Sequence, residues 1–333
     1  YLSDPEAICR LQKTVDRFFE EIQYQREMKA WEELKQESEV IKHSPLAADW
    51  MVIGALMEGT GFSILKECRD YLTGRQLGWY LLALSGELEE DAVAYAEEAV
   101  RILQNSFSQV ELLHILYMEG EYRKVLEWAD KAVMQALEEG NLWTLAESYN
   151  MKGTVYACFN MEDLMLKEYK RAAHLLEESR WKKDLSNICY NIGATYLGIG
   201  RYEEAEQYLE QTIDKPRFMG YHKFALLYFR TGRRAEAWKA LKKMEQCEAY
   251  GREKDLKEEI LEVTRLELAG QTEGEDFLNV LENLMHAFQE RHMFGYMMFF
   301  HDLLQRQYTS RRMYRKAYLL EEQFSDIQSK TSL

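Results

Sequence analysis

Proline is scarce in this sequence, with only Pro5, Pro45 and Pro216 among 333 residues. An all-β fold needs frequent turn signals and proline interrupts helices, so this scarcity favours long helices and argues against an all-β chain. Hydrophobic residues make up 47% of the chain and charged residues 30%. That balance predicts a packed core and argues against general disorder.

Closely spaced cysteines are also lacking. None of the five forms a Cys-x-x-Cys pair; they are Cys9, Cys68, Cys158, Cys189 and Cys247. An odd number in a chain of this length indicates free thiols in a reducing compartment, so we expect a cytoplasmic protein. No signal peptide is recognisable. The most apolar stretch, residues 293–300, is far shorter than the roughly 20 residues of a membrane-spanning helix, so we expect no membrane contact.

Basic residues are outnumbered, with 42 Lys and Arg against 57 Asp and Glu and a formal net charge of −15. Phosphate contacts need a surface rich in Lys and Arg, so we expect no direct nucleic-acid binding by this segment. Acidic side chains that coat exposed helix faces account for the charge, which also favours a basic or neutral partner.

Motifs for catalysis or metal binding are missing from the sequence. It has no His-Glu-x-x-His, and His286 and His292 are six residues apart, a spacing that does not place both on one helix face. The glycine-rich stretch 193–200 is not followed by Lys-Ser or Lys-Thr and is therefore no phosphate loop. We predict that the chain is not an enzyme and takes no cofactor or metal.

What the sequence does contain is an internal repeat. Three segments align without gaps at a spacing of 40 residues, anchored at Gly120, Asn160 and Gly200, and a fourth follows at Gly232. Each predicts a helix, a Gly or Asn in the left-handed conformation, and a second amphipathic helix. Weaker copies lie near residues 30, 86 and 313. The second helices carry small or apolar residues at helical spacing: Ala205, Tyr208, Leu209, Ile213, Ala235, Ala237, Trp238 and Leu241.

The repeat resembles the tetratricopeptide (TPR) pattern most clearly over residues 105–245. In the best copy the pattern positions are Cys189, Ile192, Gly193, Tyr196, Ala205, Leu209 and Thr212, with Pro216 one position early. The resemblance implies an all-α fold, a right-handed superhelix of stacked helix–turn–helix repeats (an α-solenoid). We expect degenerate repeats over 1–104, a regular array over 105–250 and C-terminal helical repeats over 251–333.

Helices are also expected outside the regular array. In the N-terminal third they cover residues 22–41, 45–60, 63–71 and 75–85, and in the C-terminal third 253–269, 275–291, 294–308 and 314–329. The apolar run 293–300 predicts a core helix, and the alternative is a homodimer contact through the C-terminal helices.

The 40-residue step exceeds the usual 34. Long repeats of this kind resemble the peptide-pheromone-sensing regulators of bacteria, the RRNPP group. This resemblance implies the ligand-sensing region of a helix-turn-helix transcriptional regulator in quorum sensing. Its DNA-binding domain is expected to be absent from this chain, which begins at Tyr1 rather than Met. Two alternatives stay open: a TPR scaffold or adaptor for protein–protein interaction, and a Rap-like regulator of a signalling protein.

The resemblance implies a short peptide or protein segment in the concave groove, which the first helix of each repeat lines. Asparagine offers a donor and an acceptor, so groove asparagines can pair with an extended backbone. Arg230 is expected to pair with a ligand carboxylate. The predicted groove residues are His114, Tyr117, Asn150, Thr154, Asn187, Tyr190, Asn191, Ala194, His222, Leu226 and Arg230.

Overall fold

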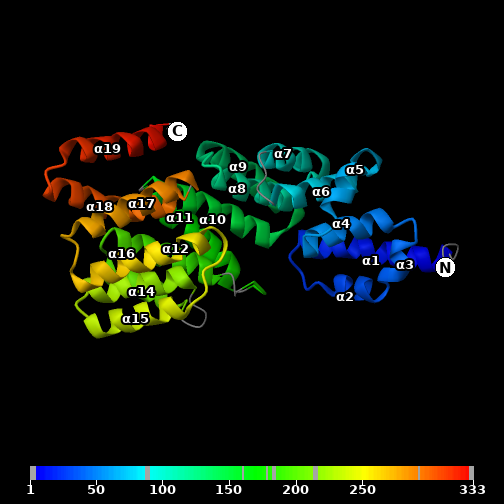
Figure 1. Ribbon diagram of the computed structural model, residues 1–333. Coiled ribbons are helices and arrows are strands. Elements are labelled where there is room, and N and C mark those ends of the chain that lie inside the picture. Colours follow the sequence, from blue (N-terminus) through cyan, green and yellow to red (C-terminus); the bar gives the residue numbers. More distant parts are fainter. Residues whose placement is uncertain are drawn as a thin grey trace. The chain divides into compact units, whose positions relative to one another are not determined.

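The computed structural model describes residues 5–86, 91–159, 161–177, 179–181, 185–212, 217–291 and 293–329 (Figure 1). Over these ranges the backbone forms α-helices and short 3-10 segments and contains no β-strand. The chain divides into two compact units, Tyr1–Met151 and Lys152–Leu333. The division falls within one helix, α10 (Leu142–Cys158). Each unit is an α-solenoid of paired helices.

The first unit begins with α1 (Pro5–Gln23), α2 (Lys29–Gln36), α3 (Ser38–Lys42), α4 (Ala47–Glu58), α5 (Phe62–Glu67) and the 3-10 turn η1 (Arg69–Tyr71). It continues with α6 (Gly74–Gly86), α7 (Ala92–Leu103), α8 (Ser106–Met118) and α9 (Tyr122–Glu139). Helices α6 and α7 pack as a pair, as do α8 and α9, and the first helices α4, α6 and α8 contact one another in order. Aromatic rings fill the core, with Phe19 stacked on Trp79 at a centroid distance of 5.4 Å.

The start of the chain differs from the helix expected over residues 22–41. Helix α1 ends at Gln23, and Gln25 takes a positive φ of 47°. The Glu21 carboxylate accepts the Ala30 N–H at 2.8 Å and so caps the first turn of α2. The Asn141 side-chain amide donates to the Gln23 carbonyl at 2.9 Å. The chain reverses here because these side chains satisfy the backbone groups that the break exposes.

The second unit continues the array. Its helices are α11 (Glu162–Glu177), α12 (Leu185–Gly198), α13 (Tyr202–Glu210), α14 (Phe218–Arg230), α15 (Arg234–Gln246), α16 (Lys257–Ala269), α17 (Glu275–Glu290), α18 (Phe294–Ser310) and α19 (Tyr314–Ser329), with the 3-10 segment η3 (Gly251–Leu256) before α16. Consecutive pairs pack from α12 with α13 to α18 with α19. The first helices α12, α14 and α16 also contact one another in order, as Figure 1 shows in green to yellow.

The turns between paired helices confirm the predicted repeat grammar. Gly120, Gly200 and Gly232 have φ values of 76°, 83° and 80°, in the left-handed region that glycine tolerates. In the weak last copy Arg312 takes the equivalent position with a φ of 60°. The second predicted anchor, Asn160, lies outside the described residues.

Small residues set the spacing within the pairs. An added Cβ on Gly193 would lie 2.7 Å from Leu209 Cγ, so α12 approaches α13 at this point more closely than any side chain allows. Ala205 and Ala237 are completely buried, as predicted. The expected apolar face of α15 was wrong in register. Ala237, Ala240, Leu241 and Met244 are buried, whereas Ala235 is exposed and Trp238 is 43% exposed, because Trp238 lies one position off that stripe.

The C-terminal helices agree closely with the expected ranges, except that residues 251–256 form η3 rather than the first turn of α16. Within the apolar run of α18, Met297 and Phe300 are buried, while Tyr296 and Phe299 are half-buried. The run is therefore core on one face and partly exposed on another. Among the helices described, none is both long and apolar enough to cross a bilayer.

Candidate functional site

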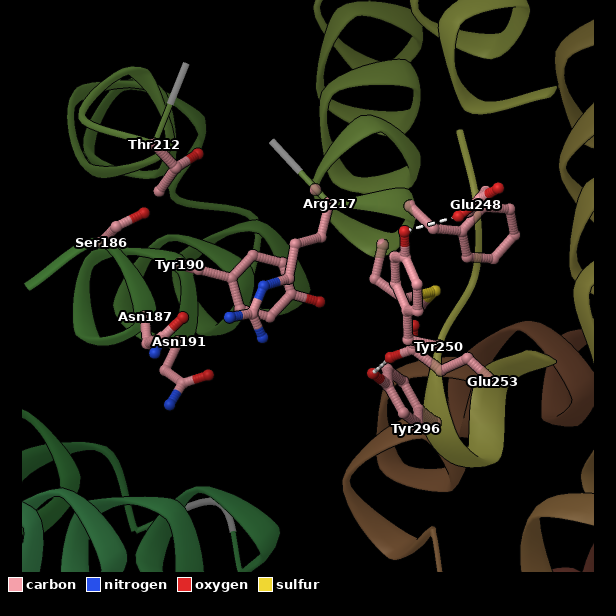
Figure 2. Close-up of a pocket in the computed structure, with 13 residues that line it drawn as sticks. Ser186, Asn187, Tyr190, Asn191, Thr212, Arg217, Glu248, Tyr250, Glu253 and Tyr296 are labelled. Atoms are coloured by element: carbon pink, nitrogen blue, oxygen red, sulfur yellow. Dashed lines mark hydrogen bonds between the residues drawn. The ribbon is translucent and has the colours of Figure 1, made fainter. Parts of the chain in front are cut away.

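The second unit contains a cavity of about 670 Å³ between α12 on one side and α14, η3 and α18 on the other (Figure 2). This volume lies within the range of roughly 300–1,000 Å³ that small-ligand sites occupy. Its lining residues are Ser186, Asn187, Tyr190, Asn191, Thr212, Arg217, Phe218, Met219, Gly220, Glu248, Tyr250, Glu253 and Tyr296.

Helix α12 supplies the polar wall. Its apolar side packs on α13, which directs the opposite stripe of residues i, i+3 and i+4 into the cavity. That stripe is Asn187, Tyr190 and Asn191, so three of the predicted groove residues lie together (Figure 2). Asn187 is exposed, whereas Tyr190 and Asn191 are half-buried. Ala194 continues the same helix and is half-buried, but it does not line the cavity.

Acidic and phenolic side chains form the facing wall. The Tyr296 hydroxyl on α18 donates a hydrogen bond to Glu253 on η3, and the Tyr250 hydroxyl donates to Glu248 at 2.6 Å (Figure 2). Burial raises the pKa of Glu253, although Tyr296 opposes that shift. Burial also raises the pKa of Tyr190, and the negative charge of Glu253 adds to it. This wall therefore presents hydrogen-bond acceptors and aromatic rings.

Arg217 brings a positive charge into the same cavity. It precedes the first residue of α14, and its side chain extends into the space between the two walls (Figure 2). Its charge lowers the pKa of Glu253, against the larger effect of burial. Among the described residues, no ion pair or hydrogen bond occupies the Arg217 guanidinium. The cavity thus carries both signs of charge beside neutral amides.

The three predicted groove residues of α14 lie elsewhere. His222 and Leu226 are completely buried, and the His222 ring packs against Phe300 at a centroid distance of 5.6 Å. Both are core residues in this structure. Arg230 is half-buried and donates to the Leu197 carbonyl at 3.2 Å. None of the three lines the cavity.

The remaining predicted residues form local contacts. In the first unit the His114 Nε2 atom lies 3.0 Å from the Glu147 carboxylate, and the Asn150 amide donates to the same carboxylate at 3.1 Å. Burial alone would lower the pKa of His114, but hydrogen bonds to Glu111 and Glu147 raise it to about 10. In the same unit, Tyr117 packs on Tyr122. In the second unit, Thr154 accepts a hydrogen bond from the Tyr169 hydroxyl at 3.2 Å.

Sequence reasoning missed the residues of the facing wall. Arg217, Tyr250 and Glu253 lie in segments between paired helices, where the repeat pattern assigns no position. Tyr296 lies on α18, in an apolar run that indicated core packing. The sequence carried no periodic signal for this wall, because residues 248–252 lie between two expected helices and residue 253 was only the first residue of the second.

The cavity lining combines several kinds of polar group. Over the parts of the chain that the structure describes, no group of three or more His, Cys, Asp or Glu side chains could hold a metal ion. The cavity lining has amide, hydroxyl, carboxylate and guanidinium groups on opposite walls, an arrangement that can hydrogen-bond and neutralise a polar, charged ligand.

Comparisons with known proteins agree with this architecture. The family model described as "Tetratricopeptide repeat" matches residues 186–215, which include α13 and all of α12 except its first residue. A solved structure titled "Crystal Structure of Rap Protein Complexed with Competence and Sporulation Factor" is similar, with a TM-score of 0.69 and 13% identity. The alignment covers 97% of this chain and 98% of the Rap chain. No curated protein matches the sequence at a significant level. Residues 186–215 therefore match a tetratricopeptide repeat, and the fold resembles that of the Rap protein over nearly the whole chain.

Proposed function

We propose that this chain is a peptide-binding TPR module and that a short peptide occupies the cavity beside α12. The observation that carries this proposal is the pairing of two walls with complementary chemistry. Asn187 and Asn191 lie on one wall, and Glu253 and Tyr296 lie on the other. A peptide has amide donors and acceptors along its length and a charge at each end, and the cavity has a partner for each of these groups.

The two walls divide the recognition between backbone and side chains. The amides of Asn187 and Asn191 pair with the N–H and C=O groups of an extended backbone, independently of its sequence. Glu248 and Glu253 accept hydrogen bonds from an ammonium or guanidinium group of the ligand. Tyr250 and Tyr296 add aromatic surface, against which a cation is also stabilised. A basic ligand is consistent with the net charge of −15.

The structural comparison supports the choice of ligand class. The similar Rap protein was solved in complex with the Competence and Sporulation Factor. By fold analogy, binding of a comparable ligand in the cytoplasm would shift this array between conformations and regulate an attached or associated domain. In our leading interpretation that domain is a helix-turn-helix DNA-binding module, and the chain is the sensor region of a transcriptional regulator.

A second candidate function, that of a Rap-like regulator, is supported by how much of the chain aligns with the Rap protein. The alignment to the Rap protein covers 97% of this chain, so the N-terminal helices share the Rap fold as well as the array. This favours a Rap-like regulator that binds a signalling protein directly. A gene segment encoding a helix-turn-helix domain upstream of Tyr1 would favour the transcriptional regulator. Specific capture of a purified response-regulator domain would favour the Rap-like function.

Affinity selection of short random peptides followed by calorimetric titration tests the peptide site. Asn191→Ala is expected to weaken the affinity for a selected peptide by about tenfold, which corresponds to one or two lost hydrogen bonds. Its thermal stability should stay nearly unchanged. Asn279→Ala is the matched control, because Asn279 is exposed on α17 and lies outside the cavity. Equal affinities of both variants and wild type would remove Asn191 from the site, and no selected peptide at all would refute the function.

A further inference from the structure

The outward side of α15 has an excess of positive charge in an otherwise acidic chain. Helix α15 has four Lys and Arg residues against two Glu residues. The other second helices of the pairs, α7, α9, α11, α13, α17 and α19, each have more Asp and Glu than Lys and Arg. Because the whole chain has a net charge of −15, α15 reverses the sign of the charge locally.

The four cations of α15 are exposed and, among the described residues, form no ion pair or hydrogen bond. They are Arg234, Lys239, Lys242 and Lys243. Lys243 has one ring contact, 5.7 Å from the centre of Tyr221. Neighbouring basic residues are paired, Arg233 with Glu206 at 2.6 Å and Arg265 with Glu245 at 3.1 Å. The second pair also neutralises one of the two carboxylates of α15, so the cations remain in excess.

An exposed tryptophan lies among these cations. Trp238 follows Arg234 by four residues and precedes Lys242 by four, so the three side chains form one row along the helix. Lys239 and Lys243 form a second row beside it. The opposite side of α15 packs on α14 and α16 at the edge of the second unit (Figure 1), and Trp238 stays 43% exposed. We call these five residues the α15 face.

The size of the α15 face fits a helix better than a nucleic acid or a membrane. With a rise of 1.5 Å per residue, the distance along the axis from Arg234 to Lys243 is about 14 Å. Carboxylates four residues apart on a partner helix repeat every ~6 Å, as the cations of each row do. A phosphate backbone or an anionic bilayer extends beyond this face, where the acidic remainder of the chain repels it.

We propose that the α15 face is a docking surface for an acidic amphipathic helix of a partner protein. Carboxylates of that helix pair with the four cations, and an apolar side chain between them covers Trp238, a residue type that often anchors protein interfaces. None of the five residues lines the cavity, so the proposal does not depend on peptide binding there. Exposed ion pairs around one aromatic anchor give a weak and salt-sensitive contact.

Three synthetic helical peptides of equal length test this surface on the full chain. The first has Glu at four-residue spacing beside Leu on one face, the second has the same composition with Glu and Leu distributed around the helix, and the third has Lys in place of Glu. By calorimetric titration, wild type should bind the first peptide about fivefold or more tightly than the second, and the third not measurably. Equal affinities for the first two would overturn the proposal, as would no binding at all.

Variants of the chain locate the contact. Lys239→Glu combined with Lys242→Glu should weaken binding of the first peptide about tenfold, because two ion pairs become repulsive contacts. Trp238→Ala should weaken it by a similar factor. The matched control is Lys167→Glu combined with Lys170→Glu, which makes the same charge change at exposed positions of α11 and should leave the affinity unchanged. Equal losses in the test and control variants would refute a specific surface.

Other occupants of the α15 face give different results. Tighter binding of a short DNA duplex or of phosphatidylserine vesicles than of the first peptide, lost in the Lys239→Glu and Lys242→Glu variant, would assign the face to phosphate groups and overturn the proposal. Sedimentation of wild type and this variant tests a second copy of the chain. Self-association of wild type that the variant abolishes would identify that copy as the occupant and likewise overturn the proposal.

Discussion

Replacement of Lys223 by methionine should stabilise the protein. The Lys223 ammonium group is buried against Phe299, and no acceptor among the described residues reaches it. Burial lowers its pKa well below the usual value, and the charge of Arg230 lowers it further. Methionine keeps the unbranched shape of the side chain and removes the charge, so the apolar contacts along α14 are retained.

The expected gain follows from two opposing contributions. An unsatisfied buried charged group costs about 3 kcal/mol or more, beyond the usual range for neutral polar groups. A cation over a desolvated ring recovers roughly 2 kcal/mol at most. The net stabilisation by Lys223→Met is therefore about 1 kcal/mol or more, and for a unit of this size each kcal/mol raises Tm by roughly 2–4 °C.

The gain should depend on pH in a defined direction. Because the pKa of Lys223 is lower in the folded than in the unfolded chain, the unfolded chain binds more protons between the two values. Wild-type stability therefore rises with pH across that window, up to the unfolded value near 10.5. The variant lacks this dependence, so its advantage should be largest at neutral pH and shrink as pH approaches 10.5.

Urea unfolding and thermal scans at several pH values measure this difference. Lys239→Met is the matched control, since Lys239 is exposed on α15 and its replacement should change stability by no more than about 0.5 kcal/mol. A Lys223→Met protein that is less stable than wild type at neutral pH would refute the reasoning. That result would mean that the ammonium group has a favourable partner which methionine cannot replace.

Three further predictions concern other parts of the chain. His114→Gln should reduce the free energy of unfolding below pH 6.5, where the charged imidazole contributes its full stabilisation. The difference from wild type should disappear as pH rises through about 10, the pKa of His114 in the folded chain. Urea unfolding at a series of pH values measures it. Gly193→Ala should lower the free energy of unfolding by about 1–3 kcal/mol, because the new methyl group clashes with Leu209. Gly86→Ala is the control in the same urea assay and should not destabilise the protein, since no atom lies within 4 Å of the added Cβ. Asp49→Ala should lower Tm by several degrees, since the buried carboxylate accepts hydrogen bonds from two side chains of α6; an unchanged Tm would contradict that role.

The repeat made the centre of the fold predictable from sequence. A left-handed glycine after each first helix and small residues at the close approach are properties of the local sequence, and Gly200, Gly232 and Ala205 adopt the expected conformation and burial. The same register placed Asn187 and Asn191 on one face of α12, where they line the cavity.

The cavity wall formed by Glu253 and the burial of His222 could not be predicted from the sequence, because both depend on contacts between distant segments. Glu253 lies in the cavity because η3 packs beside α16 and because Tyr296 holds its carboxylate, and neither fact has a periodic signature. His222 appeared at a groove position in the repeat register, yet two phenylalanines of α18 cover its ring. Tertiary packing of a helix outside the regular array decided which residues of α14 are buried.

The hydrogen bond from Asn141 to the Gln23 carbonyl cannot form during synthesis until both residues have been translated. Its partners are 118 residues apart. At a translation rate of roughly 5–20 residues per second, the Gln23 carbonyl waits about 6–24 s before Asn141 is made. During that interval the break after α1 lacks this partner. Slower translation between these positions would lengthen the exposure of the nascent N-terminal helices to chaperones and proteases.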